Sequence, residues 1–223
     1  MITSAANPRL KLVRKLASRR QRDKQGLFVV EGEDLVEAGL EPVELLVAGE
    51  TVAPELLAEV STLPHPARRI AVFRREDLPS FEARPVSLAL WRIADPGNVG
   101  TLIRTADAFG ASVSLSEGCA DPTGPKSLRA SAGAVFRVPL GDFGHEGGRR
   151  IALAAHGAQP LGDVDLAEPV TFVLGAEREG LPQEVLSRCD DSATIPTPGD
   201  AESLNVAAAG AIALYEWSRR RAL

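Results

Sequence analysis

Apolar residues near the start of the chain recur at helical spacing. Asn7 followed by Pro8 is a favourable helix start, with Asn7 as N-cap and Pro8 in the first turn. The apolar positions that follow at helical intervals are Leu10, Val13, Leu16 and Ala17. This spacing predicts one helix to about Arg22, and the apolar run Leu27–Val30 predicts a short strand after it.

From residue 86 onward the pattern changes to short apolar runs that hardly alternate. The runs are Val86–Ile93, Ser112–Leu115, Ile151–Ala155, Thr171–Leu174 and Ala193–Ile195. Strands buried on both faces of a parallel sheet show this pattern. Helical segments lie between or after them, at Val99–Phe109, about Pro125–Ala132, Pro182–Cys189 and Ser203 to about Arg221. The alternation predicts an α/β fold with a parallel sheet over residues 86–223, preceded by a small α/β domain over residues 1–85.

Composition narrows the class of protein. The chain has 223 residues, of which 44% are hydrophobic and 25% charged, which excludes a disordered tail, a collagen and a disulfide scaffold. Cys119 and Cys189 stand far apart, so we expect two reduced thiols and no zinc finger. The longest apolar run, Val206–Leu214, is far shorter than the roughly 20 residues of a membrane span. With no signal-peptide pattern at its N-terminus, the chain is expected to be cytoplasmic.

The first 25 residues are strongly basic. Their only acidic residue is Asp23, and their basic residues are Arg9, Lys11, Arg14, Lys15, Arg19, Arg20, Arg22 and Lys24. The whole chain carries a formal net charge of −5, so the rest of it is acidic. A basic arm on an acidic body favours a polyanionic partner, and the alternative is a solvated helix face.

Common nucleotide and metal motifs are missing from the sequence. GxGxxG is absent. The stretch Gly118–Ser127 fails as a phosphate loop because its glycines are one residue too far apart and Pro125 separates Gly124 from Lys126. The histidines are isolated from one another, which predicts no metal site.

One stretch, DPGNVGTLIRTADAFGA, covers residues 95–111. Its Pro-Gly pair predicts a tight turn, and Asn98 is placed to cap the helix that follows. By helical angle, Arg104 points away from the apolar stripe of that helix. Taken alone, Arg104 could be an ordinary exposed arginine.

Two further stretches combine buried strands with polar loops. In VLGAEREGLP, residues 173–182, a strand leads into a loop with two glycines around Glu177. In IPTPGDAESLNVAAAGAIALYEW, residues 195–217, Ser203 can cap a last helix that is apolar nearly all round. Such a helix is expected to be buried on several sides or to lie at a subunit interface. Taken alone, Glu177 could be a solvated turn residue, and Ser203 and Asn205 could serve only the helix start.

Together and in this order, the three stretches resemble the three motifs of the SpoU/TrmH family of RNA ribose 2′-O-methyltransferases, within the SPOUT superfamily. The first resembles the family's NxGxxxR motif, the second its lGxExxG motif and the third its IPxxGxxxSLN motif. Residues 126–140 resemble the segment ahead of the family's central strands. The N-terminal stretch resembles the RNA-binding domain of members that act on ribosomal RNA, so the resemblance covers nearly the whole chain.

The resemblance implies a methyltransferase domain with a C-terminal trefoil knot, a homodimer and S-adenosylmethionine as cofactor. It implies these cofactor-binding residues: Leu174, Gly175, Ile195, Pro196, Leu204 and Asn205. The implied catalytic residues are Asn98, Arg104, Glu177, Ser203 and Asn205, with Arg104 completing the site of the partner subunit. From the basic arm and the segment after residue 124 we expect these RNA contacts: Arg9, Lys11, Arg14, Arg22, Lys126 and Arg129.

The implied reaction methylates a ribose 2′-hydroxyl, with ribosomal RNA favoured over tRNA. A guanidinium keeps its proton near neutral pH, so we expect Arg104 to hold a phosphate and stabilise the developing alkoxide rather than act as a base. The alternatives are a base methyltransferase and an inactive RNA-binding or assembly protein of the same fold. Two departures from the family are Ala207, where a serine is frequent, and the short glycine-rich segment 141–150, expected to loosen that side of the domain.

Overall fold

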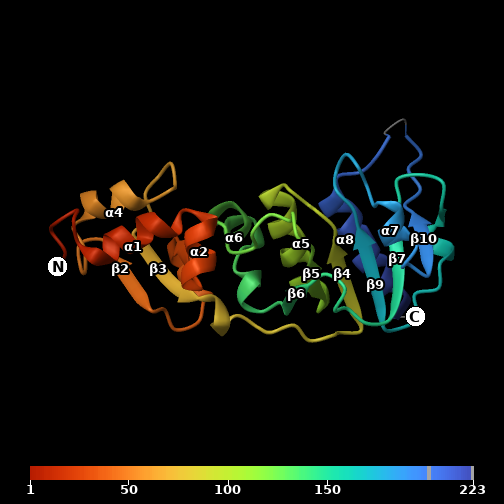
Figure 1. The fold of residues 1–223 in the computed structure, drawn as a ribbon, viewed down its shortest axis with the longest axis horizontal. Coiled ribbons are helices and arrows are strands. Elements are labelled where there is room, and N and C mark those ends of the chain that lie inside the picture. Colours follow the sequence, from red (N-terminus) through yellow and green to blue (C-terminus); the bar gives the residue numbers. More distant parts are fainter. Residues whose placement is uncertain (200–201, 222–223) are drawn as a thin grey trace.

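A computed structural model describes residues 1–199 and 202–221. The molecule is elongated, with an N-terminal domain at one end, the larger parallel sheet at the other, and α6 (Pro125–Ser131) and α5 (Pro96–Phe109) between them (Figure 1). The extended segment of residues 78–85 connects the two domains.

The N-terminal domain consists of short helices on a small antiparallel sheet. Its helices are α1 (Pro8–Leu16), α2 (Arg19–Gln25), α3 (Glu33–Glu37) and α4 (Pro54–Val60), with the 3-10 turn η1 (Arg75–Asp77) at its end. Its strands are β1 (Leu27–Glu31), β2 (Glu44–Val47) and β3 (Arg69–Arg74), in the order β1-β3-β2. Both pairs in this sheet are antiparallel.

The single helix predicted from Asn7 to about Arg22 is wrong in its extent. Asn7 does cap α1, because its side chain accepts a hydrogen bond from the Arg9 N–H. The helix ends at Leu16, and Ser18 adopts an extended conformation before α2 begins. Arg22 donates hydrogen bonds to the carbonyls of Leu16 and Ala17, both at 2.9 Å, and so satisfies two groups at the end of α1.

The second domain is built on a parallel sheet, as the sequence predicts. Among the described residues this sheet has seven strands in the order β6-β5-β4-β9-β7-β10-β8, and each neighbouring pair is parallel. The strands are β4 (Val86–Leu90), β5 (Ser112–Leu115), β6 (Leu140–Asp142), β7 (Arg149–Leu153), β8 (Gln159–Pro160), β9 (Val170–Leu174) and β10 (Asp191–Thr194). The remaining helices are α7 (Gln183–Leu186) and α8 (Val206–Arg221), with 3-10 turns η2 (Ala134–Phe136) and η3 (Leu161–Asp163).

Side chains of the central strands pack alternately on the two faces of the sheet. Leu88 and Leu90 of β4 pack with Phe172 and Leu174 of β9 in the main core, which also takes in residues of α5 and α8. Ala89 and Val173 face the opposite way, toward Val185 of α7. This period of two explains why both strands consist almost entirely of apolar residues.

Two glycines let α5 pack closely against its neighbouring helices. A Cβ on Gly100 would lie 2.4 Å from the Ser127 carbonyl oxygen in α6. A Cβ on Gly210 of α8 would lie 2.4 Å from the side chain of Leu102. These close approaches fix α5, which carries Asn98 and Arg104, between α6 and α8.

An apolar cluster joins the two domains. Phe28 and Phe73 of the small sheet pack with Leu128, Val135 and Phe136 of the second domain. The ring centroids of Phe73 and Phe136 are 5.1 Å apart, and those of Phe28 and Phe136 are 6.0 Å apart. One face of the N-terminal sheet is therefore buried against the second domain instead of being open to solvent.

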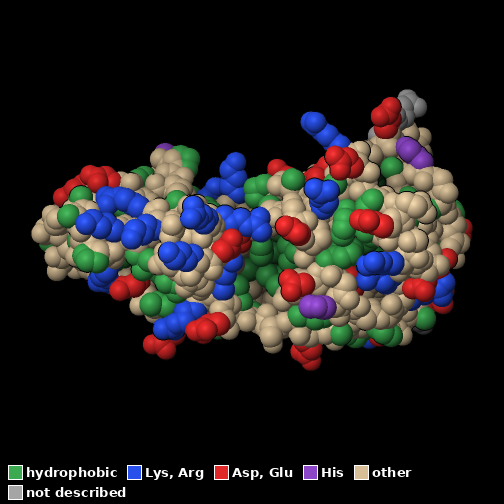
Figure 2. All heavy atoms as spheres, viewed as in Figure 1, with side chains coloured by type: hydrophobic (Ala, Val, Ile, Leu, Met, Phe, Trp, Pro, Cys, Tyr) green, Lys and Arg blue, Asp and Glu red, His purple; other side chains and the backbone are tan. Residues whose placement is uncertain are grey.

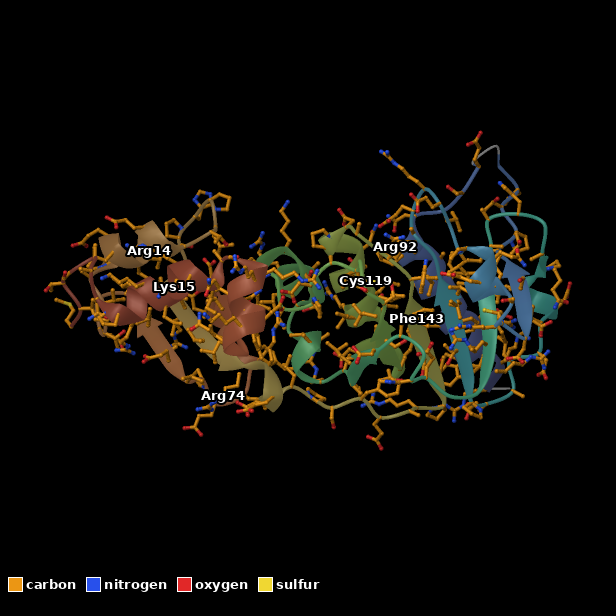
Figure 3. The ribbon with its side chains drawn as sticks, in the orientation of Figure 1. Arg14, Lys15, Arg74, Arg92, Cys119 and Phe143 are labelled. Carbon is orange, nitrogen blue, oxygen red and sulfur yellow. The ribbon has the colours of Figure 1, made fainter. Side chains whose placement is uncertain are left out.

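The short segment between β6 and β7 is held in place by its own side chains. Phe143, labelled in Figure 3, packs edge-on against Trp91 with ring centroids 5.1 Å apart, and the Arg150 guanidinium lies over the Phe143 ring. Arg150 also pairs with the buried Glu146 at 2.9 Å. These contacts anchor a segment that the sequence led us to expect to be loose.

Candidate functional site

A cavity of about 810 Å³ opens at the carboxyl ends of β7, β9 and β10. Its floor is apolar and includes Leu153, Leu174, Ala193, Ile195 and Val206. Its rim is polar and includes His156, Glu177, Arg178, Glu202, Ser203 and Asn205. Ligands of α/β proteins bind outside the carboxyl ends of parallel strands, so this cavity is the candidate ligand site.

Most of the residues predicted to bind a cofactor line this cavity. Those that do are Leu174, Gly175, Ile195, Leu204 and Asn205. Pro196 is not among the described lining residues, although its neighbours Ile195 and Thr197 are. Residues 153–156 also line the cavity, so the carboxyl end of β7 belongs to the candidate ligand site.

Gly175 occupies a position where no side chain fits. A Cβ there would lie 2.4 Å from the Gly180 carbonyl carbon and 2.6 Å from the Leu181 nitrogen. The loop after β9 turns back on itself, with the Gly180 N–H donating to the Ala176 carbonyl at 2.9 Å. Because residue 175 is a glycine, the backbone at residues 180 and 181 can approach it closely. The tight loop that results carries Glu177 at the rim of the cavity.

Hydrogen bonds join the three predicted motifs at the rim of the cavity. The Asn205 Nδ2 group donates to Asn98 Oδ1 at 3.0 Å. The Asn98 Nδ2 group in turn donates to Glu177 Oε1 at 3.0 Å. Three loops that are far apart in the sequence thus converge, and the chain of bonds ends on a carboxylate.

The helix caps differ from the predicted ones in a way that explains this chain of bonds. Asp95, not Asn98, caps α5, because its carboxylate accepts the Asn98 N–H at 2.9 Å. Asn205, not Ser203, caps α8, because its Oδ1 accepts the N–H groups of Ala207 and Ala208 at 2.9 and 3.2 Å. With Oδ1 so engaged, the Nδ2 of Asn205 faces Asn98. The Asp-Pro pair at the start of α5 was the sequence signal for the true cap.

Arg104 lies apart from the other predicted catalytic residues. Its side chain is exposed, and it is not among the described residues that line the cavity. It follows Asn98 by six positions, which is about 9 Å along the helix and roughly 240° around it. None of the hydrogen bonds at the rim among the described residues involves Arg104.

The predicted RNA-contacting residues of the arm divide into three groups. Lys11 is exposed. Arg9 and Arg14 pair with Glu44 and Glu59 of their own domain but keep more than a third of their side chains exposed. Arg22 is only 5% exposed and is bound to Asp121, so its predicted phosphate contact is not available in this structure. Figure 2 shows Lys and Arg side chains gathered over this domain, and Figure 3 places Arg14 and Lys15 there.

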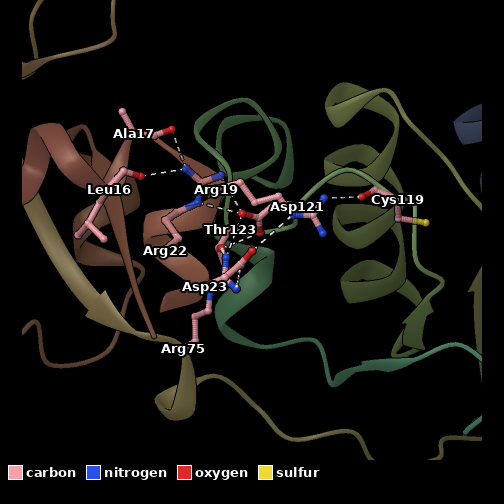
Figure 4. Close-up of polar contacts among 9 residues, drawn as sticks. All are labelled: Leu16, Ala17, Arg19, Arg22, Asp23, Arg75, Cys119, Asp121 and Thr123. Carbon is pink, nitrogen blue, oxygen red and sulfur yellow. Dashed lines mark hydrogen bonds and ion pairs between the residues drawn. The ribbon is translucent and has the colours of Figure 1, made fainter. Parts of the chain in front are cut away.

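Asp121 is the centre of an ion-pair cluster between the domains, which we call the Asp121 cluster and define as Arg22, Arg75, Asp121 and Thr123 (Figure 4). Asp121 accepts from Arg22 at 2.8 Å and from Arg75 at 2.9 Å, and its other oxygen accepts the Thr123 hydroxyl at 2.7 Å. Burial raises the pKa of Asp121, but the Thr123 hydrogen bond, the charge of Arg75 and the hydrogen bond from Arg22 outweigh it and lower the pKa overall.

Other predictions concern thiols, metals and membranes. Cys119 and Cys189 are free, and burial raises the pKa of both thiols, so neither is activated. Among the described residues, no group of His, Cys, Asp and Glu side chains has the arrangement of a metal site. No helix in the described part of the chain has the length and apolar character needed to cross a membrane.

The fold combines an α/β domain that has a ligand cavity at its strand ends with a small N-terminal domain whose first helices are basic. The family described as SpoU rRNA Methylase matches residues 85–215, and the MRM3-like substrate binding domain matches residues 7–75. The chain belongs to the SpoU rRNA methylase family.

Two curated relatives carry specific names. A 23S rRNA guanosine 2′-O-methyltransferase of Bacillus subtilis is 33% identical over 96% of this chain and 97% of its own length. A 23S rRNA uridine 2′-O-methyltransferase of Streptomyces viridochromogenes is 32% identical over 76% of this chain and 67% of its own length.

Solved structures agree over nearly the whole chain. A TrmH-family protein from Porphyromonas gingivalis superposes with a TM-score of 0.87 and 32% identity, covering 99% of this chain and 100% of that one. An rRNA methyltransferase from Sinorhizobium meliloti, solved with S-adenosylmethionine bound, superposes with a TM-score of 0.86 and 28% identity, covering 98% of this chain and 97% of that one.

Proposed function

We propose that this protein transfers a methyl group from S-adenosylmethionine to a ribose 2′-hydroxyl of RNA, with ribosomal RNA as its substrate. The observation that carries the proposal is the chain of hydrogen bonds from Asn205 through Asn98 to Glu177 at the rim of the cavity. The named activities of the relatives from B. subtilis and S. viridochromogenes support it. Such an enzyme acts in the cytoplasm.

The cavity suits S-adenosylmethionine in size and chemistry. Its volume of about 810 Å³ lies within the range of small-molecule sites. The apolar floor at Leu174 and Ile195 fits an adenine ring, and Leu204 offers a further apolar surface that is 37% exposed. At the rim the carboxylates Glu177 and Glu202 outnumber the one arginine, Arg178, which favours a cationic ligand. When bound there, the cofactor supplies an electrophilic methyl group.

The protein's own groups orient the RNA and stabilise charge. Glu177 and Asn98 are held by the hydrogen bonds at the rim, and Ser203 lines the same wall, so these side chains position the ribose. The 2′-hydroxyl oxygen gains negative charge as its proton is released to water, before or while it attacks the methyl group, and a fixed guanidinium lowers the cost of that charge. We assign this role to Arg104, which also grips the neighbouring phosphate through a charge-assisted contact.

We propose a homodimer in which Arg104 of one subunit reaches the reacting ribose at the site of the other. Its exposure and its absence from the cavity wall support this arrangement. Ile212 and Tyr215 on α8 are 38% and 59% exposed, which offers an apolar surface for the partner. We also propose that the segment leading into α8 passes through a loop to form the trefoil knot of the family, and that the domain boundary lies at residue 85.

Mixed dimers test whether Arg104 acts across the interface. In a dimer of one Arg104→Ala chain and one Gly175→Ala chain, one site keeps an intact cavity and receives Arg104 from the partner. At a cofactor concentration that does not saturate Gly175→Ala, we expect methyl transfer to be faster in such mixtures than in either variant alone. If Arg104 acted within its own chain, every site of the mixed dimer would lack one group and no such gain would appear.

The experiment for the function itself follows labelled methyl groups into RNA. Wild type, Arg104→Ala and the control Arg188→Ala are incubated with labelled S-adenosylmethionine and with unmodified 23S rRNA or tRNA. A 2′-O-methyl blocks alkaline cleavage at its own linkage, so we expect label in alkali-resistant dinucleotides from 23S rRNA. We expect Arg104→Ala to lower the rate roughly 100-fold or more.

Other outcomes identify the alternatives. Label in single nucleotides after alkaline hydrolysis would mean methylation of a base. Label in tRNA alone would keep the chemistry and change the substrate. Cofactor binding without transfer to either RNA would identify an inactive RNA-binding or assembly protein. Activity that survives in Arg104→Ala would refute the role given to that residue.

A further inference from the structure

A second cavity lies at the junction of the two domains. It has a volume of about 510 Å³ and is lined by residues of both domains. Arg19 and Thr62 come from the N-terminal domain, and Ala120, Lys126 and Arg129 come from the segment between β5 and α6 and from α6 itself. We call this cavity the junction cleft. The cofactor cavity and the junction cleft share no lining residue.

The junction cleft is strongly cationic. Arg19, Lys126 and Arg129 are exposed and line it, and Asp121 is the only carboxylate among its described lining residues. Asp121 is already paired with Arg22 and Arg75 and contributes no free negative charge. Arg19 is 58% exposed, and its closest carboxylate contact, to Asp23, is 3.9 Å long. The charges in the cleft therefore remain available for an anion.

The walls of the junction cleft are fixed before any ligand binds. Arg22 and Arg75 tie the N-terminal domain to Asp121 beside the cleft, and Arg19 Nη1 donates to the Cys119 carbonyl at 3.1 Å across the same junction. The cluster of Phe28, Phe73 and Phe136 packs the domains together nearby. Cations on a preformed frame lose less entropy on binding than cations on a loose arm.

The junction cleft borders the segment that leads to the proposed active site. Ala94 and Pro96 are among its lining residues, and Pro96 is the first residue of α5. Asn98 follows two positions later, and its side chain donates the hydrogen bond to Glu177 at the rim of the other cavity. A polyanion lying in the cleft would reach α5 at the end where the methyl acceptor must sit.

We propose that the junction cleft binds the sugar-phosphate backbone of the substrate RNA next to the target nucleotide, through Arg19, Lys126 and Arg129. This rests on the proposed function, because it names how that substrate is held. None of the described lining residues is aromatic, so the cleft holds phosphates rather than stacked bases. Arg22, predicted from the sequence to touch RNA, instead helps to build the frame of this site.

Salt-dependent binding tests the proposal. The Kd of an unmodified 23S rRNA transcript is measured at several salt concentrations for wild type, Arg129→Ala and Lys126→Ala/Arg129→Ala. Each phosphate contact that is lost lowers the slope of log K against log salt by about one. We expect a decrease of about one for the single variant and about two for the double variant. At low salt we expect Kd to rise roughly tenfold for Arg129→Ala.

The matched control is Arg188→Ala, which removes another exposed arginine, one that lines neither cavity. We expect it to keep the wild-type slope. Affinity for S-adenosylmethionine, measured by calorimetry, is expected to stay unchanged in all variants, which shows that the fold and cofactor cavity are intact. A merely structural role for Lys126 or Arg129 would change that affinity or stability without changing the salt slope.

The outcomes separate this proposal from the function it rests on. If the double variant keeps the wild-type slope while the wild type methylates RNA, the cleft proposal is overturned and the proposed function stands. If the slope falls in the cleft variants but the wild type transfers no methyl group, RNA binding at the cleft stands and the proposed function fails. An equal decrease of slope in Arg188→Ala would also overturn the proposal, because the effect would then be one of net charge.

Discussion

Replacing Asp121 with asparagine removes the charge at the centre of the domain junction and keeps its shape. In the wild type, Arg22 and Asp121 have only 5% and 8% of their side chains exposed, and their closest N–O distance is 2.8 Å. Removing one partner of a buried ion pair costs about 3–5 kcal/mol, because the other charge stays buried without compensation. Arg75 is 28% exposed and also pairs with Asp23. Loss of the Arg75–Asp121 ion pair therefore adds little to the destabilisation.

We therefore expect Asp121→Asn to lower the free energy of unfolding by about 3 kcal/mol. For a chain of this size that corresponds to a decrease in Tm of about 6–12 °C. The measurement is urea denaturation followed by tryptophan fluorescence, together with a thermal scan by circular dichroism. The matched control is Asp23→Asn, which removes a carboxylate that contacts Arg75 but is 50% exposed. We expect that control to cost less than about 1 kcal/mol.

The pH dependence gives a second readout of the same variant. The Asp121 pKa in the folded protein lies below its ordinary value of 3.8. A carboxylate with a lowered pKa contributes stability above its unfolded pKa and loses it as the pH falls through the folded pKa. Wild type should lose this contribution below about pH 4, whereas Asp121→Asn should show a flatter profile there. Equal destabilisation by Asp121→Asn and Asp23→Asn would refute the reasoning from burial.

Three further variants test separate features. Gly175→Ala places a Cβ 2.4 Å from the Gly180 carbonyl carbon, so we expect calorimetry to show at least a tenfold loss of S-adenosylmethionine affinity; wild-type affinity would mean that the loop is free to shift. Arg92 has a φ of 52°, so Arg92→Gly should raise the free energy of unfolding by about 1 kcal/mol in urea, and a decrease would contradict this. Asn205→Ala removes the α8 cap and should cost about 1 kcal/mol, whereas Asn205→Ser should restore stability but not methyl transfer. If Asn205→Ser restored both stability and methyl transfer, the amide of Asn205 would have no role in the reaction.

The sheet and its main helices could be predicted because their signals are local. Strands buried on both faces consist of continuous apolar runs, and the strand Ser112–Leu115 was predicted with its observed ends. The start of α8 was misplaced by three residues because Ser203 and Asn205 are both good caps. Which of the two residues caps α8 is settled by the fold, in which the Asn205 side chain also donates to Asn98, a residue distant in the sequence.

The domain junction could not be predicted because its contacts join distant parts of the chain. Arg22 lies in a basic run that is typical of a solvated surface, and its partner Asp121 is 99 residues away. Nothing in the local pattern separates Arg22 from its exposed neighbours. The convergence of Asn98, Glu177 and Asn205 likewise came from a resemblance to a family and not from their spacing.

The aromatic packing between the domains has a consequence for target choice. Phe28 and Phe73 of the small domain are buried against Phe136 of the second domain. This packing holds the basic helices at one distance from the cavity at the ends of β7, β9 and β10. In the RNA that we propose as substrate, the methylated nucleotide would then be selected partly by its distance from the phosphates bound at the small domain.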